Sequence, residues 1–175
     1  MANILLVSAY AILGFTLYRL GKNGILMGSI IFNVLMTFYF FMVGSVVGGV
    51  TCLIAIVRSY YFYRNEVRGK PNPLASLIFF IAIVLISIVV TYDNISSLLM
   101  GVLSITGVVI YWYNGSERLD SASLIKFGSP IISLCFILYA IALGSFLMVP
   151  LELILLLGGT FGGFKWIKKN GEAGV

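Results

Sequence analysis

The sequence predicts an all-α membrane protein in which seven transmembrane helices form a 3+1+3 parallel repeat. Three observations support this fold class. First, 61% of the 175 residues are hydrophobic and only 10% are charged, whereas soluble domains carry about 25% charged residues. Second, the apolar stretches approach the roughly 20 residues that a spanning helix needs. Third, the two halves of the chain share similar positions at a fixed offset, which indicates an internal repeat.

Charged residues, Gly/Asn pairs and prolines divide the sequence into seven apolar spans. The first span ends at the polar run 19–24, and Gly44-Ser45 separates the second from the third. Residues 64–73 contain several charges and two prolines, and they have the composition of a linker. The spans cover residues 3–18, 25–43, 46–63, 74–92, 95–113, 121–143 and 146–164.

The later spans are bounded in the same way. Asp93-Asn94 ends the fourth span, the polar loop 114–120 ends the fifth, and Gly144-Ser145 ends the sixth. The chain therefore divides into four parts. These are a first triple-helix bundle (1–63), an internal loop with linker helix (64–94), a second triple-helix bundle (95–164) and a basic cytoplasmic tail (165–175).

The placement of basic residues predicts the orientation, because Lys and Arg favour cytoplasmic loops and helix ends. With the N-terminus outside, every Lys and Arg falls in an internal loop, in the tail or in the internal half of a helix. This arrangement requires an odd number of spans, since an even number would return the basic tail to the outside. We therefore expect seven spans with the N-terminus outside and the C-terminus in the cytoplasm.

An offset of 100 residues brings the second and third spans onto the sixth and seventh. The aligned positions are Gly28-Ser29 with Gly128-Ser129, Ile31 with Ile131, Tyr39 with Tyr139, Gly44-Ser45 with Gly144-Ser145, and Leu53-Ile54 with Leu153-Ile154. An offset of 93 residues aligns the first span with the fifth, and the fourth stays unpaired. The two copies then enter the membrane from the same side, which is a parallel repeat about an axis along the membrane normal.

This organisation resembles the SWEET and PQ-loop superfamily, and within it most closely the YgjV family of bacterial inner membrane proteins. The resemblance covers nearly the whole chain and is carried by the stretches 28–33 and 128–133, the two Gly-Ser turns and the stretch 53–58. It implies a bacterial inner membrane location and a transporter fold. Pro130 fits the superfamily's prolines, which the first, second and fifth spans lack.

Two charged residues inside the spans are candidates for function, because charge within a membrane is costly. Glu152 lies about six residues into the seventh span, too deep for a short side chain to reach water. It is either a substrate or proton site, or a structural hydrogen-bond partner of a neighbouring helix. Its repeat equivalent is Cys52. Arg58 either extends its long side chain to the internal interface or lines the substrate path.

Several uncharged polar residues and two prolines complete the expected path. Asn33 and its repeat partner Ser133 are expected at mid-membrane, where they either bridge helices or line a path. For Thr37, Thr51 and Ser129 we favour hydroxyls bonded to the carbonyl one turn back. Pro130 and Pro150 interrupt the sixth and seventh spans, as hinges or as fixed bends.

The composition also limits the function. The chain has no histidine, which removes imidazole bases, His-ligated metals and Ser/His/Asp catalysis. We expect no enzymatic activity, no catalytic residue, no metal and no cofactor, and no nucleic-acid partner. The favoured function is movement of a small polar solute without ATP, by facilitated diffusion or by proton coupling at Glu152. The alternative is a membrane scaffold or receptor that binds a partner or lipid; a homo-oligomer is compatible with both.

Overall fold

The computed structural model describes residues 2–19, 22–116 and 122–171, and these ranges contain seven helices and no strand. Every predicted span is helical. The helices are α1 (Ala2–Arg19), α2 (Lys22–Met42), α3 (Val46–Val67), α4 (Leu74–Thr91), α5 (Ile95–Ser116), α6 (Ala122–Leu143) and α7 (Met148–Gly171).

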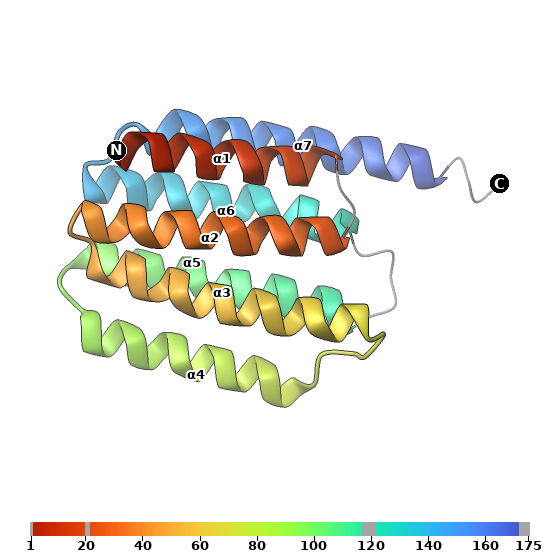
Figure 1. The fold of residues 1–175 in the computed structure, drawn as a ribbon, viewed down its shortest axis with the longest axis horizontal. Helices are drawn as coiled ribbons and strands as arrows, with labels where there is room; N and C mark the ends of the chain where they lie inside the picture. The colour runs from red at the N-terminus through yellow and green to blue at the C-terminus, as the bar shows by residue number, and fades with distance from the viewer. Residues whose placement is uncertain (1, 20–21, 117–121, 172–175) are drawn as a thin grey trace.

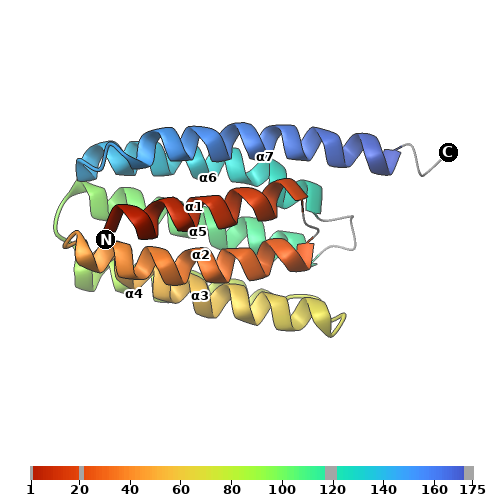
Figure 2. The same ribbon diagram turned by 45° about the horizontal axis from the view of Figure 1, so that its top comes forward.

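Six of the helices close a ring, and α4 lies outside it. Figure 1 shows α1, α2 and α3 side by side in one layer, with α7, α6 and α5 behind them. Within the layers α2 packs between α1 and α3, and α6 packs between α5 and α7. Across the layers α1 contacts α7 and α3 contacts α5. Helix α4 packs on α3 and α5 at the edge of the bundle (Figures 1 and 2).

The helices alternate in direction, so every connection lies at one of the two ends of the bundle (Figure 1). The two ends differ in their content of Lys and Arg. We call the end with the N-terminus and the connections 43–45, 92–94 and 144–147 the turn end; these connections contain no Lys or Arg. At the opposite end, which we call the basic end, lie Arg64, Arg68, Lys70 and Lys165. The charge asymmetry expected from the sequence is therefore an asymmetry between the two ends of one bundle.

Two turns at the turn end have the same backbone geometry. Gly44 and Gly144 have φ angles of 80° and 72°, a conformation that glycine adopts without steric cost. The amide of Ser45 donates to the carbonyl of Phe40 at 2.8 Å, and that of Ser145 donates to the carbonyl of Ala140 at 2.9 Å. Both helices thus end in a Schellman motif, and the sequence offset of 100 residues relates the two turns.

The helix ends differ from the prediction at several places; α5, for example, continues to Ser116 and so enters the predicted loop 114–120. Helix α3 continues to Val67, because Gly69, at φ 63°, provides the left-handed residue that ends it. Helix α7 continues to Gly171 through the predicted tail, since residues 165–170 contain neither Gly nor Pro. It begins at Met148, which places Pro150 in its first turn. A proline there removes no intrahelical hydrogen bond, whereas Pro130 lies inside α6.

The exterior suits a lipid environment. Helices α2, α3, α4, α5 and α7 are long and apolar enough to cross a membrane, while the described apolar parts of α1 and α6, Ala2–Tyr18 and Gly128–Leu143, are shorter. Large apolar side chains point outward on all seven helices; Val89 of α4, for example, is 78% exposed. Small residues allow close packing within the ring: a Cβ on Gly28 would lie 2.4 Å from the Thr16 side chain.

Candidate functional site: a polar cavity inside the helical ring

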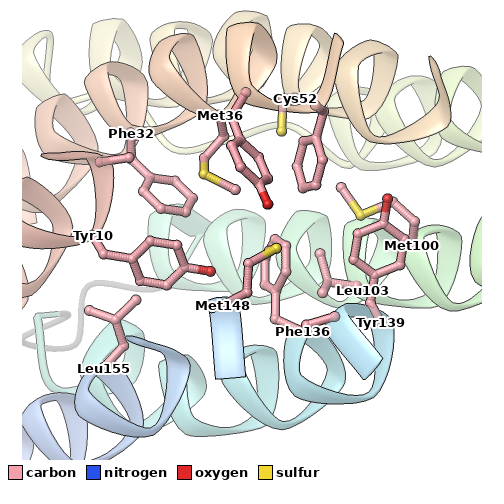
Figure 3. Close-up of a cluster of buried hydrophobic side chains, with 14 of the residues drawn as sticks. Tyr10, Phe32, Met36, Cys52, Met100, Leu103, Phe136, Tyr139, Met148 and Leu155 are labelled. Atoms are coloured by element: carbon pink, nitrogen blue, oxygen red, sulfur yellow. The ribbon is translucent and has the colours of Figure 1, made fainter. Parts of the chain in front are cut away.

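A cavity of about 90 Å³ lies at the centre of the ring, which is room for several water molecules. All six ring helices contribute to its wall and α4 contributes nothing. Figure 3 shows the surrounding core, in which Tyr10, Phe32, Cys52, Met100 and Phe136 point inward from five helices. The polar wall residues are Ser29, Asn33, Thr51, Arg58, Ser104, Tyr111, Ser129, Ser133 and Glu152.

Glu152 lies in the cavity wall and has hydrogen-bond partners on two other helices. Its side chain is only 1% exposed. The hydroxyl of Tyr10 on α1 donates to Oε1 of Glu152, and the hydroxyl of Ser133 on α6 also bonds to the carboxyl group. Glu152 therefore joins α7 to α1 and α6, and it also faces the cavity.

Arg58 lies in the wall near the middle of α3. The side chain is 6% exposed, so it stays between the helices and does not extend to the interface. Its guanidinium carbon lies 5.0 Å from the centre of the Tyr111 ring, within cation–π range. Gly107 makes room for it, since a Cβ there would lie 3.0 Å from Nη1. Within the described ranges Nε is buried without a hydrogen-bond partner.

The remaining polar groups form short bonds within and between helices. The Asn33 amide donates to the Ser29 carbonyl at 2.7 Å, and the Ser29 hydroxyl lies 3.4 Å from that of Ser59 on α3. Thr37 donates to the Asn33 carbonyl and Thr51 to the Val47 carbonyl, both at 2.7 Å. The expected bonding of threonine hydroxyls one turn back is confirmed for these two residues.

Towards the turn end, two tyrosine–serine pairs cross between the layers. Tyr39 of α2 lies with its hydroxyl 2.5 Å from that of Ser145, and Tyr139 of α6 lies with its hydroxyl 2.8 Å from that of Ser45. Phe40 packs edge-on against Tyr139 with 5.8 Å between ring centres. Tyr139 and Phe40 are fully buried. We call Tyr39, Ser145, Tyr139 and Ser45 the tyrosine–serine clasp.

Comparison with known proteins places the chain in a family. The family model described as "Bacterial inner membrane protein", Imp-YgjV, matches residues 1–170. The chain belongs to the Imp-YgjV family. Neither the curated proteins nor the solved structures contain a significant match to it. This Imp-YgjV member is therefore a multi-pass protein of the bacterial inner membrane, in agreement with its apolar helices.

Most predicted path residues of this Imp-YgjV protein meet around one space. Thr37 does not line the cavity, since it lies one turn beyond Asn33 towards the clasp. Thr37 is displaced from the cavity because one helical turn separates it from Asn33 along α2. The predicted path residues that do line the cavity are Asn33, Thr51, Cys52, Arg58, Ser129, Ser133 and Glu152.

Four important tyrosines were not predicted as site residues. Tyr10, the partner of Glu152, lies in the middle of an apolar span, where its hydroxyl needs a partner; that need was the available signal. Tyr111 lies near the end of an apolar span, where aromatic residues commonly anchor a helix at the membrane interface, but it is 8% exposed and faces Arg58. The sequence offset aligned Tyr39 with Tyr139. It did not indicate that Tyr39 would bond to Ser145 in the second Gly-Ser turn, or Tyr139 to Ser45 in the first.

Proposed function

We infer that this Imp-YgjV protein is a SWEET-like transporter or facilitator of a small polar solute, that it uses no ATP and that it is not an enzyme. One observation carries this proposal: polar side chains from five helices line a cavity inside a bundle whose exterior is apolar. Polar groups within a membrane are expensive and usually mark a substrate path. The cavity forms within a single chain, so the proposal requires no second copy.

The proposal includes a topology in which all seven helices cross the membrane as a 3+1+3 parallel repeat. The clasp supports the repeat, because its two hydrogen bonds are equivalent under the offset of 100 residues. Tyr39 bonds to Ser145, and the equivalent Tyr139 bonds to Ser45. The ring contacts support it as well, because α1–α7 and α3–α5 are the same contact under this repeat. The positions of Lys and Arg support a cytoplasmic basic end and an external N-terminus.

Transport through this cavity requires access from each side in turn. The clasp lies between the cavity and the turn end, while Leu17 and Tyr111 carry the cavity wall towards the basic end. We therefore infer that the clasp separates the cavity from the external side in the present conformation. Opening it would need α6 to move relative to α2, and Pro130, which interrupts the hydrogen bonds of α6, is the candidate hinge.

The non-transporting scaffold or receptor is the second candidate function. The observation in its favour is that Tyr10 and Ser133 are both already hydrogen-bonded to Glu152, as in a structural network. Under this alternative the cavity is a packing defect filled by water, and no solute crosses. The two functions are separated by a flux measurement.

The test uses purified protein in liposomes, with osmotic swelling followed by light scattering. The solutes are glycerol, urea, neutral amino acids and short carboxylates. A variant that fills the cavity, Ser104→Phe, is compared with Val102→Phe, which adds the same ring on the 58% exposed outer face of α5. We expect at least one solute to enter faster than in protein-free liposomes. We expect Ser104→Phe to abolish this faster entry and Val102→Phe to leave it unchanged.

Two results would contradict transport. The first is swelling no faster than in protein-free liposomes for every solute. The second is a swelling rate that Ser104→Phe leaves unchanged although the variant remains folded and monodisperse. Either result would favour the scaffold alternative.

A further inference from the structure

We propose that the cavity binds a small monocarboxylate, with the carboxylate group held by the guanidinium of Arg58. This inference deepens the proposed function by naming the solute class, and it rests on that function only where it concerns movement across the membrane. Binding itself does not depend on it.

The guanidinium of Arg58 is a buried cation that lacks an anionic partner within the described ranges. An arginine in a protein stays protonated, and a buried charge is normally paired. Nε has no hydrogen-bond partner among the described residues, and the side chain is 6% exposed in the wall of the cavity. Tyr111 presents the face of its ring to the guanidinium.

The described carboxylates do not satisfy this cation. Glu152 faces the same cavity from α7, but Tyr10 and Ser133 occupy it. Asp93 follows α4 at the turn end, far from Arg58 along the bundle. Glu66 lies eight residues further along α3, which is about 12 Å along the axis. An anion in the space beside Arg58 would therefore form the charge pair that the described carboxylates do not form with this guanidinium.

The remaining wall selects the kind of anion. A planar guanidinium matches a carboxylate in a two-bond geometry. Hydroxyl and amide groups of Ser29, Asn33 and Ser104 share the wall with Arg58. Most other wall residues are apolar, among them Leu13 and Leu103. One cation, neutral hydrogen-bonding groups and apolar side chains fit a single negative charge with a short hydrocarbon body, while Glu152 on the same wall is bonded to Tyr10 and Ser133. The volume of about 90 Å³ limits the size of the anion.

The experiment measures binding to the full chain in detergent or nanodiscs by thermal shift and calorimetry. The probes are propionate and its neutral isostere propionamide. We expect saturable binding of propionate with a rise in melting temperature, and no binding of propionamide. Equal binding of the two probes, or no binding of propionate, would overturn the proposal.

The variants assign the binding to Arg58. We expect Arg58→Gln to weaken propionate binding at least about tenfold, since a charged pair is lost. The matched control Arg68→Gln removes a charge at the exposed end of α3 and should bind as the wild type. If Arg58→Gln fails to fold, Arg58→Lys keeps the charge but loses the two-bond geometry, and weaker binding is expected. Unchanged affinity in a folded Arg58 variant would overturn the assignment.

The outcome is distinguishable from that of the proposed function. Propionate binding without flux in liposomes would support this inference and contradict transport. Flux of a neutral solute without propionate binding would support transport and overturn this inference. A second binding readout is alkylation of Cys52, which lines the same cavity: in a Cys135→Ser background, propionate should slow its reaction with a membrane-permeant maleimide and propionamide should not.

Discussion

The Tyr39 hydroxyl lies 2.5 Å from the Ser145 hydroxyl and joins the end of α2 to the turn that precedes α7. The pair between Tyr139 and Ser45 is its counterpart at 2.8 Å. Ser45 also accepts a hydrogen bond from the amide of Gly48 and so caps α3. One serine oxygen thus takes part both in a helix cap and in the contact between the halves.

Removing the tyrosine hydroxyls should weaken this contact. We expect Tyr39→Phe and Tyr139→Phe each to lower the free energy of unfolding by about 0.5–1.5 kcal/mol, and the double variant to raise alkylation of Cys52 from the external side. Tyr60→Phe, at a residue 57% exposed, is the control. Thermal unfolding and maleimide labelling provide the measurements; double-variant labelling at the wild-type rate would show that the clasp does not restrict access.

Glutamine should replace Glu152 without loss of folding. Its amide oxygen still accepts from Tyr10, and its amide group still bonds to Ser133. Because Gln imitates the protonated acid, we expect Glu152→Gln to carry solute at a rate independent of pH, whereas wild-type flux varies with pH if a proton is coupled there. Liposome flux across a pH series is the measurement. An unchanged pH profile in the variant would remove Glu152 from proton coupling.

A leucine at the same position tests the structural role of the network. Glu152→Leu leaves the hydroxyls of Tyr10 and Ser133 without their partner. We expect a loss of about 1–3 kcal/mol of stability for each buried group left unsatisfied. Thermal unfolding of the leucine and glutamine variants in parallel makes the comparison, and equal stability of the two would mean that the network does not hold α7 to α1.

Cysteine labelling tests the orientation. In a variant without Cys52 and Cys135, we expect Asp93→Cys and Phe146→Cys, both exposed at the turn end, to react with an impermeant thiol reagent added to intact cells. Lys70→Cys, exposed at the basic end, should react only after the membrane is opened. Labelling of Lys70→Cys in intact cells would reverse the proposed orientation.

Alanine at Gly28 tests the close packing of α1 on α2. The new Cβ would lie 2.4 Å from the Thr16 side chain, and we expect a loss of about 1–3 kcal/mol from overpacking. Gly158→Ala is the matched control, because nothing lies within 4 Å of its Cβ position; it should be neutral or stabilising, as alanine favours helix. Equal thermal unfolding of both variants would mean that α1 shifts to make room.

The sequence predicted the helices better than their contacts. Hydropathy and turn residues located every span to within a few residues of its helix, except where α7 continues through its basic segment. The spans are apolar on nearly every side, so their periodicity does not tell which face points inward. The pairing of Tyr10 with Glu152 and the burial of Arg58 depend on that choice of face, and the sequence alone left both open.

The position of α4 has a genetic consequence. Under the proposed repeat, α4 adds nothing to the cavity wall but lets one gene encode a ring that two separate three-helix chains would otherwise build as a dimer. Two identical chains must present the same residue twice. Joined halves are free to diverge, and they have done so at the cavity: Glu152 stands where the other half has Cys52. Under the proposed repeat, joining the halves thus permits an asymmetric site in which Glu152 is the one acid among the described wall residues.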